Sequence, residues 1–81
     1  MSKANVILYS RPGCHLCEEA KEAMRSAGCD ELFTLEEINI ETDRDKLKKY
    51  QYEIPVIEIN GVEVFRYRVD PAEFRKRIAT D

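Results

Sequence analysis

Two cysteines, Cys14 and Cys17, form a Cys-x-x-Cys motif near the start of the chain. An apolar run at residues 6–9 precedes the motif, Gly13 lies directly before it, and a helical pattern follows it. A strand that leads through a glycine-containing loop into a helix places Cys14 at the helix N-terminus. Free backbone N–H groups and the helix dipole favour negative charge there. We therefore expect a lowered pKa for the Cys14 thiol, whose thiolate form is the one that attacks disulfides.

Cys17 lies one helical turn after Cys14, on the same side of the predicted helix. In thiol–disulfide exchange, the Cys14 thiolate attacks a disulfide to form a mixed disulfide, and Cys17 then resolves it. The alternative interpretation makes Cys14 a buried, inert cysteine and gives Cys17 a packing role beside Leu16 and Ala20. The position at a helix start favours the first interpretation, so the motif predicts a dithiol thiol–disulfide oxidoreductase.

Other side chains near the motif are open to two interpretations each. His15, the only histidine, lowers the pKa of Cys14 as a cation or carries a proton. Alternatively it is exposed without an electrostatic role, because the helix dipole disfavours imidazolium there. Arg11 either attracts an anionic substrate and helps to hold the thiolate, or is a solvated loop residue. Cys29 is either a passive thiol or a site of glutathionylation or of an intermolecular disulfide.

The length of 81 residues predicts one domain spanning residues 1–81. The apolar share of 43% and the charged share of 36% are typical of a globular domain. The 13 basic and 16 acidic residues are interspersed and give a net charge of -3. This pattern does not indicate a nucleic-acid patch or a membrane-surface helix. We expect a monomer without nucleic-acid or membrane partners.

The first residues and the cysteine count indicate a cytoplasmic protein. Residues 1–5 run directly into the first strand pattern without the apolar region of a signal peptide. The three cysteines cannot all pair within one chain, and stable structural disulfides are rare in the cytosol. A Cys-x-x-Cys beside a strand–helix pattern in that compartment indicates redox chemistry rather than a structural disulfide.

Hydrophobic periodicity predicts strands and helices that alternate along the chain. The strands are expected at residues 5–9, 33–40, 55–59 and 62–67, and the helices at 15–27, at 43–51 and from 71 onward. The apolar alternation slips between Leu35 and Ile38, which predicts either a bulge or apolar contacts on both faces of that strand. The order β-α-β-α-β-β-α predicts an α/β fold with a mixed four-stranded sheet flanked by helices.

Short polar signals mark the ends of several elements. Thr42 is expected to cap the second helix. Asn60-Gly61 between two apolar runs predicts a tight hairpin, because both residues tolerate a positive φ. Asp70 directly before Pro71 predicts the start of the last helix, with Asp70 as its cap.

With these elements in place, the chain resembles the thioredoxin fold and, within it, glutaredoxin-like proteins. Three motifs carry the resemblance: Cys14-His15-Leu16-Cys17 after the first strand, Ile54-Pro55 before the third, and Asn60-Gly61 in the hairpin. The resemblance implies a cis Ile54–Pro55 bond that packs against Cys14. It also implies that the backbone of Ile54 pairs with a substrate chain. Tyr67 is a further residue that could line the groove near the cysteines.

The resemblance implies a disulfide-containing protein or glutathione as substrate and a reductase as electron donor, with no bound cofactor and no metal. Glutathione is then a possible co-substrate. The chain differs from well-studied glutaredoxins at two places. His15-Leu16 stands where they usually have Pro-Tyr, and bulky side chains within residues 65–69 replace their Gly-Gly pair. Asp70 matches the acidic position that helps to hold glutathione in that family.

Two other classes of function are alternatives. Two thiolates supply half of a Cys₄ site, so a dimer could hold zinc or an iron–sulfur cluster. The chain has no second Cys-x-x-Cys to complete such a site alone. A thioredoxin-like scaffold could also bind partners without turning over a substrate, since a fold does not determine function.

Overall fold

The computed structural model describes residues 3–80 and contains a four-stranded sheet with the order β2-β1-β3-β4. The elements along the chain are β1 (Ala4–Ser10), α1 (His15–Ser26), the 3₁₀ turn η1 (Asp30–Leu32), β2 (Phe33–Asn39), the 3₁₀ turn η2 (Ile40–Thr42), α2 (Arg44–Tyr50), β3 (Val56–Ile59), β4 (Val62–Arg66) and α3 (Pro71–Thr80). β1 runs parallel to β2, and β3 is antiparallel to both β1 and β4. The predicted element order and the mixed sheet are confirmed.

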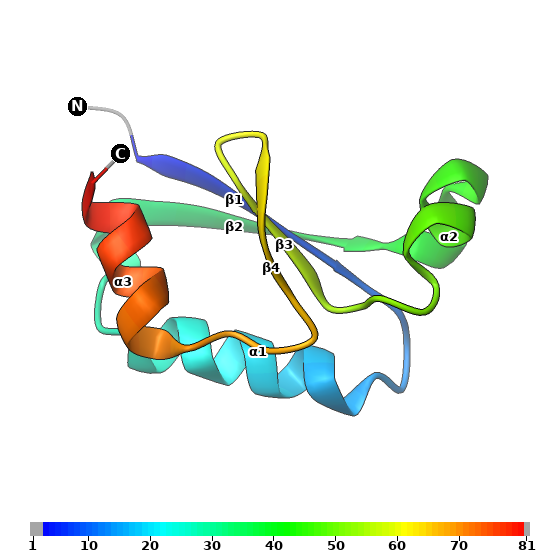
Figure 1. Cartoon of the computed structure of the whole chain (residues 1–81), viewed down its shortest axis with the longest axis horizontal. Coiled ribbons are helices and arrows are strands. Elements are labelled where there is room, and N and C mark those ends of the chain that lie inside the picture. The colour runs from blue at the N-terminus through cyan, green and yellow to red at the C-terminus, as the bar shows by residue number, and fades with distance from the viewer. Residues whose placement is uncertain (1–2, 81) are drawn as a thin grey trace.

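In Figure 1, α1 and α3 lie along one side of the sheet, whereas the short α2 lies at one end of it. α1 and α3 pack on one face over a core that includes Leu8, Met24 and Phe74. α2 packs on the other face, where Tyr50 and Tyr9 lie with their ring centroids 4.9 Å apart. Because successive residues of a strand point to opposite faces, the neighbours Leu8 and Tyr9 enter different cores. The end of β1 that leads into the Cys-x-x-Cys loop is therefore buried on both sides.

β2 contributes apolar side chains to both faces of the sheet. All 7 of its residues pair with β1 in unbroken register. Phe33 lies in the core beneath α1 and α3, whereas Ile38 packs against the core beneath α2. Of the two predictions for this strand, apolar contacts on both faces are confirmed, and the register shift lies instead between β3 and β4.

Asp43 is the N-cap of α2, so the prediction that Thr42 caps this helix is wrong. A carboxylate oxygen of Asp43 accepts hydrogen bonds from the N–H groups of Asp45 and Lys46, at 3.0 and 3.2 Å. Thr42 belongs to η2 and donates its hydroxyl to the carbonyl of Asn39 at 2.7 Å. Threonine and aspartate are both good caps, and the intervening 3₁₀ turn decides between them by moving the helix start one residue along the chain.

The predicted hairpin and the predicted start of α3 are both present. Asn60 has a φ of 52° and Gly61 a φ of 85°, so both central residues of the turn between β3 and β4 are left-handed. That conformation matches the right-handed twist of the flanking strands. At the start of α3, the Asp70 carboxylate accepts a hydrogen bond from the N–H of Ala72 at 3.1 Å.

Candidate active site

The loop between β1 and α1 is a tight turn that delivers Cys14 to the helix. The N–H of Cys14 donates to the carbonyl of Arg11 at 3.2 Å, which closes a four-residue turn. Pro12 and Gly13 are its central residues, and Gly13 has a φ of 79°. Proline at the second position and left-handed glycine at the third are typical of a type II turn. The chain therefore reverses directly after β1, and Cys14 becomes the N-cap of α1.

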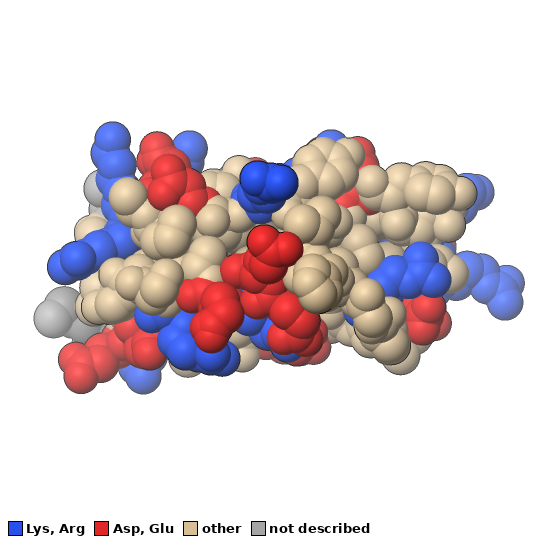
Figure 2. All heavy atoms as spheres, turned by 90° about the horizontal axis from the view of Figure 1, so that it is seen from below, with Lys and Arg blue, Asp and Glu red and all other residues tan. Residues whose placement is uncertain are grey.

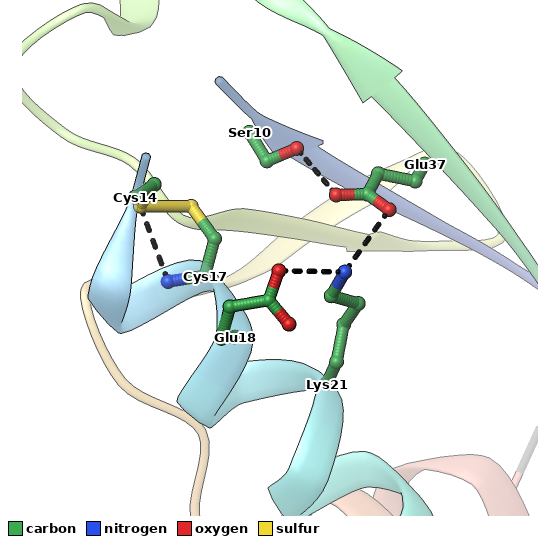
Figure 3. Close-up of a disulfide and its surroundings, with 6 residues drawn as sticks. All are labelled: Ser10, Cys14, Cys17, Glu18, Lys21 and Glu37. Carbon is green, nitrogen blue, oxygen red and sulfur yellow. Dashed lines mark hydrogen bonds and ion pairs between the residues drawn. A yellow bond between two sulfur atoms is a disulfide. The ribbon is translucent and has the colours of Figure 1, made fainter. Parts of the chain in front are cut away.

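Cys14 and Cys17 form a disulfide at the N-terminus of α1, with their Cα atoms 5.3 Å apart (Figure 3). The backbone N–H of Cys17 also donates to Sγ of Cys14 at 3.1 Å. The two residues differ in exposure, because Cys14 is partly exposed and Cys17 is only 2% exposed. Cys14 is therefore the more accessible residue of the pair.

A polar network lies beside the disulfide and joins the elements that hold it (Figure 3). The buried Ser10, at the end of β1, donates its hydroxyl to the Glu37 carboxylate of β2 at 2.8 Å. Lys21 of α1 contacts the other oxygen of Glu37 at 3.3 Å and Glu18 at 3.1 Å. The hydrogen bonds to Glu18 and then Glu37 raise the pKa of Lys21. The network thus fastens β1, β2 and the first turns of α1 to one another.

Arg11 and His15, the basic residues predicted to help the thiolate, both lie among acids. Arg11 forms an ion pair with Glu41 at 2.9 Å, and both side chains are substantially exposed. His15 is exposed and lines a shallow surface hollow of α1 whose wall includes Glu18 and Glu19. Their predicted roles toward a substrate or the thiolate stay predictions.

Ile54 and Pro55 lie at the end of the sheet from which the Cys-x-x-Cys loop leaves. Val56, the first residue of β3, pairs with Tyr9 near the end of β1. The Ile54–Pro55 bond is cis, as the resemblance implies. Pro55 is buried, and Ile54 is half-buried outside the paired residues of β3. The backbone of Ile54 is thus not part of the β1–β3 ladder, which is a requirement for pairing with a substrate chain.

Asp70 directly precedes α3. Its side chain is exposed, and its carboxylate serves the N–H of Ala72 as a helix cap. The structure therefore gives Asp70 a structural role, and a contact with glutathione stays a prediction.

A cavity beside Leu16 brings together Tyr67 and residues that the sequence analysis did not assign to a site. Tyr67 and Arg68, from the loop between β4 and α3, line it with Leu16 and Glu19 of α1. Tyr67 was expected near the cysteines, but the contributions of Leu16 and Arg68 were not predicted. The sequence signal for Arg68 is the replacement of a glycine pair by bulky residues after a strand, and that for Leu16 is its place between the two cysteines.

Cys29 is separate from the disulfide and buried in the core beneath α1 and α3, with 4% of its surface exposed. Burial raises the pKa of the Cys29 thiol above its ordinary value. Both properties favour the interpretation of a passive thiol over that of a modification site.

Two further observations concern residues 3–80. In this part of the chain, no three His, Cys, Asp or Glu side chains form a group that could hold a metal ion. No helix in the same range is long and apolar enough to cross a membrane.

Comparison with known proteins identifies relatives of both the sequence and the structure. The family model described as Glutaredoxin-like domain (DUF836) matches residues 5–79. The glutaredoxin-like protein YDR286C homolog of Dictyostelium discoideum is 35% identical over 72 residues, covering 82% of this chain and 67% of that protein. The X-ray structure of protein XcR50 from X. campestris has a TM-score of 0.78 at 24% identity, covering 94% of this chain and 97% of that chain. The glutaredoxin-like protein NrdH-redoxin from Escherichia coli has a TM-score of 0.63 at 21% identity, covering 89% and 92% of the two chains.

The two structural similarities confirm the predicted thioredoxin-like fold. The Cys14–Cys17 pair at the helix start is consistent with a redox function. The sequence matches extend over most of the domain, from the first strand to the last helix. This chain therefore belongs to the family of glutaredoxin-like (DUF836) proteins.

Proposed function

We propose that this protein is a cytoplasmic dithiol oxidoreductase that reduces disulfides of other polypeptides. The observation that carries the proposal is the unequal exposure of the two cysteines at the N-terminus of α1. Cys14 is partly exposed and Cys17 is buried behind it. In such a pair, Cys14 can attack a disulfide of another molecule, whereas Cys17 reacts only with Cys14.

The reaction consists of two exchanges that conserve electrons. The Cys14 thiolate attacks one sulfur of the substrate disulfide, forms a new S–S bond and expels the other substrate sulfur as a thiolate, which takes up a proton. Cys17 then loses its proton and attacks Sγ of Cys14, which releases the second substrate thiol. The substrate gains two electrons and two protons, and the protein is left with the Cys14–Cys17 disulfide. Glutathione or a separate reductase returns the two electrons.

The charges around the motif favour a polypeptide over free glutathione disulfide. Acidic side chains gather in the middle of the face on the α1 side (Figure 2). Glu18 and Glu37 also line the hollow next to Gly13. Glutathione carries two carboxylates, and Arg11, the basic residue that lines this hollow, is already paired with Glu41. An extended polypeptide can instead pair with the backbone beside Pro55 and needs no cation.

A coupled turnover assay tests this proposal. Wild-type protein and Cys29→Ala, which keeps both reactive cysteines, are given insulin as a model protein disulfide. NADPH with thioredoxin reductase, or with glutathione and glutathione reductase, supplies electrons. We expect both proteins to accelerate NADPH consumption with at least one donor, and Cys14→Ser to remain at the background rate. A wild-type rate equal to background with both donors would contradict the proposed function.

A further inference from the structure

Tyr67 has a backbone conformation that a bulky residue adopts rarely. Its φ is 68°, and the N–H of Arg68 donates to the carbonyl of Arg66 at 2.7 Å. Together these make a γ-turn with Tyr67 at its centre and a positive φ, a form that is rare and strained. Glycine adopts such a conformation without steric cost. The presence of tyrosine rather than glycine at this position therefore indicates a role for the tyrosine side chain.

The strained turn is fastened to the active-site end of the sheet. The N–H of Tyr67 donates to the carbonyl of Pro55 at 2.8 Å. Pro55 is buried directly before β3, and β3 pairs with β1 close to the Cys-x-x-Cys loop. This hydrogen bond holds the Tyr67 backbone in place relative to the residues proposed to pair with substrate.

The Tyr67 side chain remains substantially exposed, with 48% of its surface accessible, and lines a cavity of about 210 Å³. Leu16, one of the two residues between the cysteines, lines the same cavity. The remaining wall residues are Glu19, Ala20, Ala23, Arg68 and Val69. The walls thus combine apolar side chains with one acid and one base, and their polar and apolar parts are of similar extent. Sites that enclose whole drug-sized ligands measure about 300–1,000 Å³, so this cavity is suited to a single side chain rather than to a whole tripeptide.

We propose that the Leu16–Tyr67 cavity binds an apolar side chain of the substrate polypeptide, close to the cysteine that Cys14 attacks. The proposal rests on the proposed function and narrows its substrate class to polypeptide disulfides with an apolar neighbour. Leu16 follows Cys14 by two residues, so a chain bonded to Cys14 passes near Leu16. Tyr67 is then a specificity-determining residue, and its strained backbone keeps the ring at the edge of the cavity.

Steady-state kinetics with matched disulfides tests the cavity. The substrates are a peptide disulfide with leucine beside its cysteine, the same peptide with serine there, and bis(2-hydroxyethyl) disulfide, which has no neighbouring side chain. Tyr67→Asn removes the ring but keeps a residue that tolerates a positive φ. Tyr67→Phe keeps the ring. Tyr52→Asn is the matched control, since Tyr52 is 84% exposed and lies just after α2.

We expect Tyr67→Asn to lower kcat/KM for the leucine peptide about tenfold, mainly through KM, because loss of the ring removes apolar contact area from the cavity. Rates with the serine peptide and the small disulfide should stay within about twofold of wild type. Tyr67→Phe and Tyr52→Asn should resemble wild type with all three substrates. If Tyr67→Asn lowers kcat/KM equally for all three substrates, Tyr67 has only a structural role. If kcat/KM is unchanged for all three, Tyr67 is not part of the substrate site. An inactive wild-type protein would instead contradict the proposed function and with it this cavity's role.

Discussion

The backbone N–H of Cys17 donates a hydrogen bond to Sγ of Cys14 across 3.1 Å, so the sulfur proposed to attack substrate is also the N-cap of α1. An N-cap side chain accepts from backbone N–H groups that have no partner within the helix. The same groups stabilise negative charge at this position. One contact therefore links the stability of α1 to the reactivity of its first cysteine.

Replacement of Cys14 separates capping from chemistry. Serine is a good N-cap, so Cys14→Ser should be as stable as the reduced wild-type protein while losing all disulfide reductase activity. Cys14→Ala should be equally inactive but less stable than Cys14→Ser by about 1 kcal/mol, because the cap is lost. Urea denaturation under reducing conditions measures the difference. Equal stabilities of the serine and alanine variants would show that the sulfur does not cap the helix.

The buried Ser10 hydroxyl and the Glu37 carboxylate should be energetically coupled. Hydrogen bonds to charged groups contribute about 1.5–3 kcal/mol, and the 42% exposure of the Glu37 side chain reduces this contribution through solvent screening. A double-mutant cycle with Ser10→Ala and Glu37→Ala should give a coupling free energy of about 1 kcal/mol. The unfolding of the oxidised protein in urea supplies the four free energies. Strictly additive effects would mean that the hydrogen bond adds nothing to stability.

Cys29 should make the folded protein less stable at alkaline pH. Burial raises the pKa of its thiol in the folded state, whereas the thiol of the unfolded chain ionises from about pH 8.5. The unfolded state therefore loses protons first, and the free energy of unfolding falls as pH rises above that value. Burial also raises the pKa of Tyr9, so the measurement belongs below the range in which tyrosine titrates.

The comparison is between the oxidised wild-type protein and oxidised Cys29→Ala, unfolded in urea between about pH 7 and about pH 9.5. The variant should show the shallower decline in unfolding free energy. Parallel declines in the two proteins would show that the Cys29 thiol ionises equally well in both states.

Arg11 should influence anionic substrates through its charge. Because Glu41 pairs with it at 2.9 Å, the effect should be small. Arg11→Gln should lower kcat/KM for a mixed disulfide with glutathione about threefold and leave a neutral disulfide unchanged, with a weaker dependence on salt. Arg25→Gln is the control, since Arg25 pairs with Glu22 near the other end of α1. If both variants behave alike, Arg11 is only a solvated loop residue.

Local sequence signals predicted the elements that position the cysteines. Gly13 before a cysteine, Asn60-Gly61 between apolar runs and Asp70 before a proline each determine the backbone over a few residues. Predictions from these signals are correct because turns and helix caps depend on the φ preferences and side chains of residues close together in sequence. The Cys14–Cys17 pairing follows for the same reason, since the two residues lie one helical turn apart.

Features that depend on contacts between distant segments could not be predicted in this way. The Ser10–Glu37 hydrogen bond joins residues 27 positions apart. The Leu16–Tyr67 cavity requires the loop after β4 to lie beside α1, and the conformation of Tyr67 opposes the ordinary preference of tyrosine. The choice of Asp43 over Thr42 depended on a 3₁₀ turn that the apolar pattern does not encode.

Trapping of the mixed disulfide tests the central claim most directly, which is that Cys14 attacks and Cys17 resolves. Reduced Cys17→Ser protein is mixed with a protein disulfide, free thiols are alkylated, and the adduct is mapped by mass spectrometry. Without the resolving thiol, a stable adduct should accumulate on Cys14, whereas wild-type protein should show none and end as the Cys14–Cys17 disulfide. The absence of an adduct on Cys14, or an adduct on Cys29 alone, would contradict the account.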